Sequence, residues 1–341
     1  MKENLFITSN YFASIADVIY SSREEFNDEI TDEKEEIIEI SRNLNFKYII
    51  TKKVEFEIQS NDIVFCNTDL LDNLFFHLKN QAKLKNITLI THQTDKLIKK
   101  RDFIKKPDCI RKWFSVNVGY KHEDLIPIPI GIASNFSKKN LNVSDFQFFE
   151  KTKFQKKALS MYINFQTNTN QNERKNIYNF FSNKEWVFTD KPSLDKQKYL
   201  KNLKKATFVL CPWGNGVDTH RFWETLYSGS IPITKKHITY NYENQLPVLF
   251  VDNYEDINYK LLKSFINDFN IDDYNFEILS NIYWKEKIKF EHNERHDSIN
   301  IKEKKLITYF FKIKRNVKRL GKSQFKKVKT TLNKILSKLG F

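Results

Sequence analysis

The densest group of residues that could do chemistry lies in 212–224, where a short apolar run meets a helical pattern. The chain has only seven glycines, yet Gly214, Gly216 and Gly229 all lie within or just after this region. Glycines in a turn let the backbone come close to a ligand. The helix that follows would present unpaired N–H groups and a partial positive charge at its N-terminus, which suits a bound diphosphate.

Two charged side chains of the expected helix add to this site. Arg221 lies in its first turn, where a guanidinium can donate two hydrogen bonds to phosphate oxygens. Glu224 lies one turn beyond, where a carboxylate can accept both hydroxyls of a ribose. The simpler alternative is that the glycines only form a turn, that Arg221 and Glu224 pair as ions, and that Phe222 is a core residue. The P-loop and dinucleotide-binding fingerprints are both missing from the chain.

Apolar runs alternate with helical patterns in both halves of the chain, which predicts two α/β domains with parallel sheets. The expected strands are residues 5–7, 48–50, 63–66, 87–90, 114–118, 126–130, 158–163, 186–188, 207–210, 231–234 and 248–251. The expected helices are residues 28–43, 70–85, 173–181, 196–204 and 219–227. The polar stretch between the halves predicts a linker. We therefore expect one domain over 1–140, a linker over 141–157, a second domain over 158–300 and a tail over 301–341.

The segment CPWGNGVDTHRFWETLYSGSIPI, residues 211–233, resembles the signature of exostosin-like and related bacterial surface-polysaccharide glycosyltransferases. Shorter pieces at 125–132, 162–165 and 246–252 are similar to the same family. The likeness covers about residues 87–255 and leaves out the first 60 residues and the tail. It implies a GT-B fold, in which two Rossmann-like domains face a cleft, with the nucleotide sugar in the C-terminal domain and the acceptor in the N-terminal domain.

The resemblance also implies roles for single residues of this segment. Arg221 would bind the diphosphate, and Glu224 would bind ribose or sugar hydroxyls. The loop of Gly214, Asn215 and Gly216 would lie close to the donor.

Four further residues have two possible roles each. Asn164 and Arg174 add phosphate contacts, or they are a strand-end amide and a surface helix charge. Asp218 contacts the ligand or caps the helix. His220 touches the donor sugar or only covers the start of the helix.

Metal-dependent GT-A enzymes need a strand-end Asp-x-Asp triplet, and the chain has none. We expect no metal and no cofactor, so that Arg221 and the helix end would stabilise the departing nucleotide diphosphate. An inverting enzyme also needs a base for the acceptor hydroxyl. His92 and Asp95 follow the expected strand 87–90, where α/β folds place ligands. The alternative is that they cap the next helix, and a retaining enzyme needs no such base.

The net charge of +15 is concentrated at the C-terminus. Residues 302–341 contain 14 Lys or Arg and one acid, Glu303, which leaves 43 basic and 41 acidic residues in 1–301. Two apolar stripes at helical spacing run through this tail: Phe310, Ile313, Val317 and Leu320, then Phe325, Val328, Leu332, Ile335, Leu336 and Leu339. A basic amphipathic segment is typical of a helix that lies on an anionic membrane surface. The alternatives are a nucleic-acid-binding arm and a solvated helix.

The three cysteines, Cys66, Cys109 and Cys211, are far apart and form no CxxC pair, which fits a reducing cytoplasm. No signal peptide and no run of about 18 apolar residues is visible.

We expect a cytoplasmic glycosyltransferase, bound peripherally to the inner face of the cell membrane. It would transfer a sugar to a lipid-linked lipopolysaccharide or capsule precursor and would bind no nucleic acid. The rivals are a nucleic-acid- or phosphate-binding protein acting through the tail, and a phosphate-ester- or glycan-modifying enzyme using the same helix end.

Overall fold

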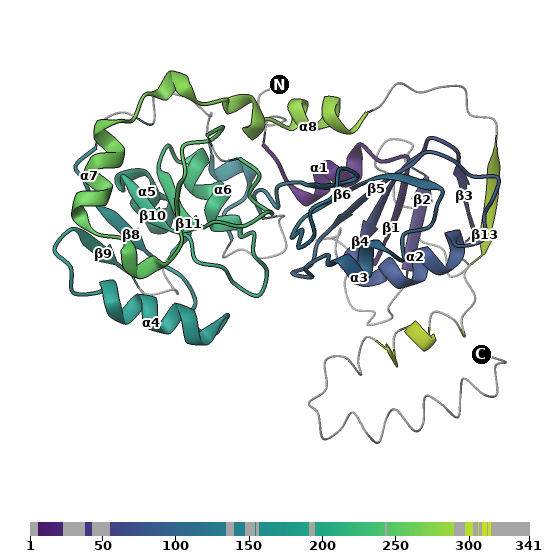
Figure 1. The fold of residues 1–341 in the computed structure, drawn as a ribbon, viewed down its shortest axis with the longest axis horizontal. Helices are drawn as coiled ribbons and strands as arrows, with labels where there is room; N and C mark the ends of the chain where they lie inside the picture. The colour runs from purple at the N-terminus through teal and green to yellow at the C-terminus, as the bar shows by residue number, and fades with distance from the viewer. Residues whose placement is uncertain are drawn as a thin grey trace.

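Parallel strands form the centre of each half of the chain, as the alternating pattern predicts (Figure 1). Two sheets contain five parallel strands each, which confirms the prediction of two Rossmann-like α/β units. The computed structural model describes residues 6–22, 38–42, 55–133, 140–146, 154, 157–190, 195–242, 244–289, 297–302, 306, 309–311 and 313–314.

The first sheet has the strand order β2-β1-β4-β5-β6-β7. Its parallel strands are β1 (Val18–Ser22), β4 (Ile63–Asn67), β5 (Ile87–His92), β6 (Ile110–Ser115) and β7 (Leu125–Pro127). All side chains of β4 and β5 are buried, as expected for mainly apolar strands at the centre of a sheet that is covered on both faces. Helix α1 (Ser9–Ser14) packs on one face, and α2 (Leu71–Leu78) and α3 (Lys100–Phe103) pack on the other.

The helix predicted over 28–43 is wrong in its described part. Residues Ile38–Arg42 form β2, which pairs antiparallel with β1 at the edge of the first sheet. Ile38 and Ile40 alternate with polar residues, and this period of two is a strand signal that the wider helical pattern obscured. The helix predicted over 70–85 is shorter, since α2 ends at Leu78. The strand predicted over 48–50 lies outside the described residues.

The second sheet has the order β12-β11-β10-β8-β9. Its strands are β8 (Met161–Ile163), β9 (Val187–Thr189), β10 (Phe208–Leu210), β11 (Ile231–Lys235) and β12 (Leu249–Val251). Helices α4 (Gln171–Phe181), α5 (Lys196–Lys205) and α6 (His220–Tyr227) connect the first four of them, and α7 (Tyr259–Asn267) follows β12. The strands and helices predicted for this half each have a counterpart within a few residues.

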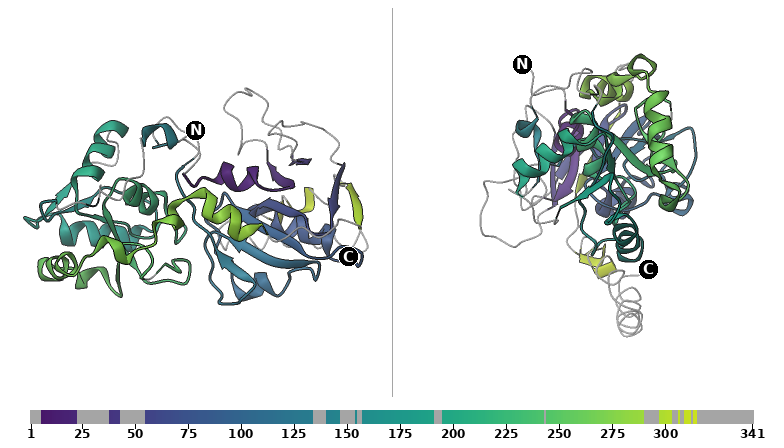
Figure 2. Two further views of the ribbon diagram at one scale, coloured as in Figure 1. Left: turned by 90° about the horizontal axis from the view of Figure 1, so that it is seen from above. Right: turned by 90° about the vertical axis from the view of Figure 1, so that its left-hand side faces the viewer.

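The chain returns to the first domain after α7. Helix α8 (Asn281–Ile288) lies beside α1 (Figure 2), and the Tyr11 hydroxyl donates a hydrogen bond of 2.7 Å to the Asn281 carbonyl. Strand β13 (Ser298–Lys302) then pairs antiparallel with β3 (Glu55–Gln59). The sequence analysis missed both strands, because their pairing joins segments more than 200 residues apart.

The expected linker contributes to the core where it is described. Leu141, Phe146 and Phe154 are buried in the cluster that also contains the second sheet. Lys157 is held by the carbonyls of Ala206 and Gly229, to which its ammonium group donates. The domain boundaries themselves stay a prediction.

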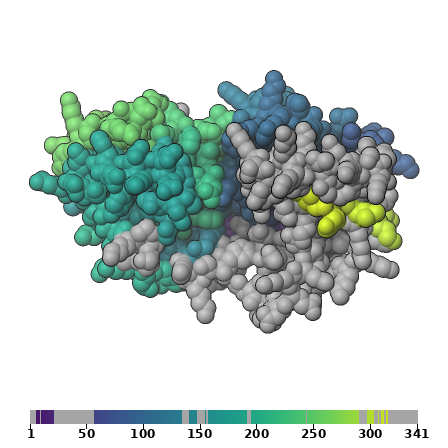
Figure 3. Space-filling view, turned by 90° about the horizontal axis from the view of Figure 1, so that it is seen from below, coloured from purple at the N-terminus to yellow at the C-terminus, as the bar shows by residue number. Residues whose placement is uncertain are grey.

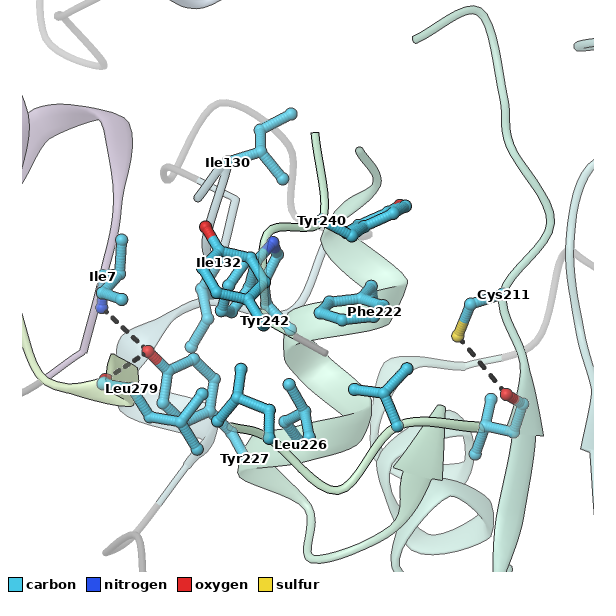
Figure 4. Packing of buried hydrophobic residues seen from close by; sticks show 14 of the residues in the cluster. Ile7, Ile130, Ile132, Cys211, Phe222, Leu226, Tyr227, Tyr240, Tyr242 and Leu279 are labelled. Atoms are coloured by element: carbon cyan, nitrogen blue, oxygen red, sulfur yellow. Dashed lines mark hydrogen bonds between the residues drawn. The ribbon is translucent and has the colours of Figure 1, made fainter. Parts of the chain in front are cut away.

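One hydrophobic core runs from the first domain into the second (Figure 4). The Tyr227 side chain of α6 is central to it, because its hydroxyl accepts from the Ile7 N–H at 3.2 Å and donates to the Leu279 carbonyl at 2.7 Å. Segments from the beginning, middle and end of the chain therefore meet around α6. A shared apolar core of this kind limits relative movement of the two domains.

The expected tail helices lie mostly outside the described residues. The residues of this segment that the structure does describe as helical are 306, 309–311 and 313–314. Within the part of the chain that the structure describes, no helix is long and apolar enough to cross a bilayer.

Candidate active site

Helix α6 begins directly behind the glycine-containing loop, as its sequence predicts. Thr219 is the N-cap residue, with extended backbone angles of φ −135° and ψ 144°. Phe222, Trp223 and Leu226 are fully buried and hold the helix against the core. The helix ends before Gly229, whose φ of 71° is a left-handed conformation that glycine adopts without steric cost.

Two polar atoms at the start of α6 are buried and have no hydrogen-bond partner among the described residues. They are Nε of Arg221 and Oγ1 of Thr219. A buried donor without a partner is costly in a folded protein, and native structures almost always satisfy such groups. An anion at the N-terminus of α6 would satisfy both atoms, with the helix dipole in the favourable direction.

The ring of Phe165 lies close to the guanidinium groups of two arginines. The Cζ atom of Arg221 is 5.9 Å from the ring centroid, and that of Arg174 is 5.5 Å from it. Burial and, to a smaller extent, the positive charge of Arg221 lower the pKa of Arg174 to about 10. The start of α6 is therefore a region of concentrated positive charge.

Arg174 is buried behind the glycine loop and holds it in place. Its Nε donates to the Trp213 carbonyl at 2.8 Å and its Nη2 to the Pro212 carbonyl at 2.9 Å. A Cβ atom on Gly214 would lie 3.1 Å from Nη2, which explains the glycine at this position. The structure thus places Arg174 as a support for the loop, and Asn164 is buried directly after β8 on the same side.

Glu224 is buried and paired with a tyrosine. Its Oε2 accepts a hydrogen bond of 2.8 Å from the Tyr199 hydroxyl of α5. Burial raises the pKa of Glu224, and the nearby His220 and Arg221 oppose this shift. Nε of Arg221 has no partner among the described residues, so this atom makes no contact with Glu224.

Asp218 joins the two domains. Its carboxylate accepts from the Ile130 N–H of the first domain at 2.8 Å and from the Trp223 indole at 3.0 Å. Its own N–H donates to Oδ1 of Asn117, again in the first domain, at 2.8 Å. Burial raises the pKa of Asp218 to about 7, although these N–H donors act against the shift. The sequence predicts that Asp218 contacts the ligand or caps α6. In the structure its carboxylate also binds the first domain, through the Ile130 N–H.

Three more contacts bring the carboxyl ends of the two sheets together. The ring Nδ1 of His220 lies 2.7 Å from the Gly131 carbonyl, and the Thr239 hydroxyl donates to the Val118 carbonyl at 3.0 Å. A Cβ atom on Gly216 would lie 3.2 Å from Oδ1 of Asp95. The loop after β5 therefore faces the glycine loop after β10, although the two are 121 residues apart in sequence.

Asn117 is a residue that the sequence analysis missed. It is fully buried, has a left-handed φ of 54°, and its amide would lie 2.9 Å from a Cβ atom on Gly216. An asparagine directly after a buried apolar run, followed by a glycine at 119, is the signal that could have identified it.

His92 and Asp95 differ sharply in their surroundings. His92 is buried; its Nδ1 accepts from the Gln93 N–H at 2.8 Å, and its Nε2 lies 3.2 Å from the Pro129 carbonyl. Asp95 is exposed next to Gly216. Neither residue caps the next helix, because the N-cap of α3 is Lys99.

The buried His92 predicts a loss of stability in mild acid. Burial lowers the pKa of His92 from 6.5 to about 3, so the folded state stays neutral while the unfolded chain takes up a proton below about pH 6.5. The contribution of the neutral His92 side chain to the free energy of unfolding is therefore present above the pKa of the unfolded chain and is lost as the pH falls. We expect His92 to reduce the free energy of unfolding by about 2 kcal/mol between about pH 7 and pH 5. Urea unfolding of the wild type and of His92→Asn at both pH values measures this loss. The variant keeps an acceptor for the Gln93 N–H but has no side chain that titrates at position 92.

The comparison between the two proteins removes the effects of all other titrating groups. An identical loss of stability in the wild type and the variant would show that His92 is not buried in the neutral form.

A pocket of about 340 Å³ lies next to the glycine loop on the side of β11 and β12. The ring of Trp213 contacts that of His237, with centroids 5.0 Å apart. The pocket is lined by Lys236, His237, Ile238, Tyr240, Asn241 and Phe250. None of these residues is predicted from the sequence to belong to a site. Within the described residues, no three His, Cys, Asp or Glu side chains are grouped so that they could hold a metal ion.

A comparison with known families matches the half of the chain that carries this site. The family described as RXYLT1 C-terminal domain matches residues 155–328, which include α6, the glycine loop and both arginines. No protein with a curated description matches the chain. The chain belongs to the RXYLT1 C-terminal domain family, a glycosyltransferase family related to the exostosin-like enzymes.

Proposed function

We propose that this protein transfers a sugar from a nucleotide-sugar donor to a glycan acceptor, with the donor diphosphate at the N-terminus of α6. The observation that carries the proposal is a pair of buried atoms, Arg221 Nε and Thr219 Oγ1, which have no partner within the described part of the chain and lie beside two guanidinium groups. Phosphate oxygens are acceptors that match these donors. Glu224 would accept hydroxyls of the ribose or the sugar.

In this proposal the acceptor hydroxyl oxygen attacks the anomeric carbon while the bond to the diphosphate breaks. The electron pair leaves with the nucleotide diphosphate, whose growing negative charge is stabilised by Arg221 and the α6 N–H groups. We propose that these groups act without a metal ion. Asp95, exposed opposite the glycine loop, would take the proton in an inverting reaction.

The acceptor and the cellular location are the finer parts of the proposal. The resemblance to surface-polysaccharide enzymes supports a lipid-linked acceptor such as a lipopolysaccharide or capsule precursor. The basic composition of 302–341 supports binding to the inner face of the cell membrane. Both parts can fail while sugar transfer itself holds.

A thermal-shift screen tests the donor site with the full chain. Nucleoside diphosphates and nucleotide sugars with different bases are added to the wild type and to Arg221→Ala. At 100 times the dissociation constant, a ligand stabilises its site by about 2.7 kcal/mol, which raises the melting temperature by several degrees. We expect one base to stand out and Arg221→Ala to lose the response.

Arg101→Ala is the matched control, because Arg101 is an exposed arginine of α3 away from this site. It should keep the full response. If no nucleotide raises the melting temperature of the wild type, or if Arg221→Ala responds as strongly as the wild type, the proposed donor site is wrong.

A further inference from the structure

The described beginning of the tail carries an apolar helix face on which two side chains are exposed and two are partly buried. Leu306, Tyr309, Phe310 and Ile313, here called the tail stripe, follow the i, i+3, i+4, i+7 spacing of one helix face and are helical in the structure. Leu306 is 66% exposed and Tyr309 is 61% exposed. Large apolar side chains at this exposure, repeated on one face, indicate a contact surface for a partner.

A different side of the same segment holds it to the first domain. Phe311 is buried, and its ring lies 6.1 Å from the ring of Phe76 in α2. Nζ of Lys314 lies 3.1 Å from Oδ2 of Asp72, also in α2. Since successive helix residues are about 100° apart, Phe311 points to another side than the tail stripe, whereas Lys314, four residues after Phe310, lies at the edge of the stripe. The described part of the tail, yellow in Figure 3, lies on the surface of the molecule.

The charge around the tail stripe identifies the partner. Residues 302–341 contain 14 Lys or Arg and one acid, so a second copy of this segment would be repelled. An anionic lipid surface attracts such a segment by about 1 kcal/mol per basic residue near it. Exposed leucine and tyrosine side chains suit the boundary between headgroups and acyl chains, whereas a nucleic-acid backbone offers them no apolar surface.

We infer that the tail stripe inserts into the interface of an anionic bilayer, and that α2 thereby places the first domain, rather than the second, next to the bilayer. The inference rests on the membrane binding proposed above and adds the contacting surface and the orientation. An acceptor carried on a membrane lipid would then approach the site from the first domain, which faces the donor-binding second domain.

Cosedimentation of the full chain with vesicles tests this inference. The vesicles contain phosphatidylcholine alone or phosphatidylcholine with phosphatidylglycerol. We expect binding to the anionic vesicles only, and about tenfold weaker partitioning for Leu306→Ser/Tyr309→Ser, because two apolar side chains lose their contact with lipid. The matched control is Ile104→Ser/Tyr259→Ser, which removes side chains that are 70% and 47% exposed elsewhere on the protein. The control should bind like the wild type.

A fluorescence measurement reports the position directly. Tyr309→Trp should be quenched by brominated lipid more strongly than Tyr259→Trp, because only residue 309 would reach the acyl chains. If the two variants are quenched equally, or if Leu306→Ser/Tyr309→Ser partitions like the wild type, the orientation is wrong while membrane binding through the basic residues stands.

Two other results would also overturn the inference. If the wild type ignores anionic vesicles and binds RNA, both the orientation and the membrane binding fail, and the tail is a nucleic-acid arm. If Leu306→Ser/Tyr309→Ser only converts a dimer to a monomer in sedimentation, a second copy covers the tail stripe. None of these results depends on glycosyl transfer, which the nucleotide screen tests separately.

Discussion

Replacing Arg221 by alanine should lower kcat/KM for the nucleotide sugar by about 10²- to 10³-fold. The Nε of Arg221 is buried at the start of α6 with no partner among the residues that the structure describes, so its hydrogen-bonding capacity is available to a ligand. The loss of nucleotide binding should raise KM, and kcat should fall as well because the interaction should strengthen as negative charge develops on the departing diphosphate. The measurement is release of the nucleoside diphosphate from the donor that the thermal-shift screen identifies.

Arg221→Lys separates charge from geometry. A lysine keeps the positive charge but cannot donate two parallel hydrogen bonds, so we expect it to recover only part of the lost rate. Arg101→Ala should be fully active. Wild-type turnover by Arg221→Ala would exclude the start of α6 as the diphosphate site.

Asp95→Asn should reduce kcat by about 10²- to 10⁴-fold while leaving donor binding unchanged. Asp95 is exposed on the loop after β5 and lies opposite Gly216 of the glycine loop. His92 is the weaker candidate for this role, because both of its ring nitrogens face backbone groups and its pKa is lowered to about 3. Initial rates with saturating donor, together with the thermal shift by that donor, separate the effect on kcat from an effect on binding.

Asp108→Asn is the control, since Asp108 is an exposed aspartate of the same domain. It should retain full activity. If Asp95→Asn is fully active, no proton is taken at this position, and NMR of the product's anomeric centre should then show a retained configuration.

Local patterns were sufficient to predict much of the second domain and its site. The loop and helix at 212–229 carry their own signals: glycines for the close approach, apolar residues at helical spacing and Gly229 for the end. Hydrogen bonds within a helix and between adjacent βα units depend mainly on nearby residues. For this reason α4, α5, α6 and the strands between them lie close to their predicted positions, with Arg221 and Glu224 on the same helix.

Long-range pairing decided what the sequence did not show. Residues 38–42 form a strand because β1 is available as a neighbour, and β3 and β13 pair only because the chain returns to the first domain after α8. Asn117 becomes part of the site only when its amide meets Gly216 and the Asp218 N–H.

The same physical reason explains the different surroundings of His92 and Asp95. They are three residues apart, His92 at the end of β5 and Asp95 on the loop after it, and residue type alone makes them equal candidates for a base. Packing against Phe12 and Phe65 buries His92, while the loop leaves Asp95 facing the other domain. Residue type and spacing determined which groups could do chemistry; burial and contacts across the domain boundary, which depend on distant segments, decided which of them can reach a ligand.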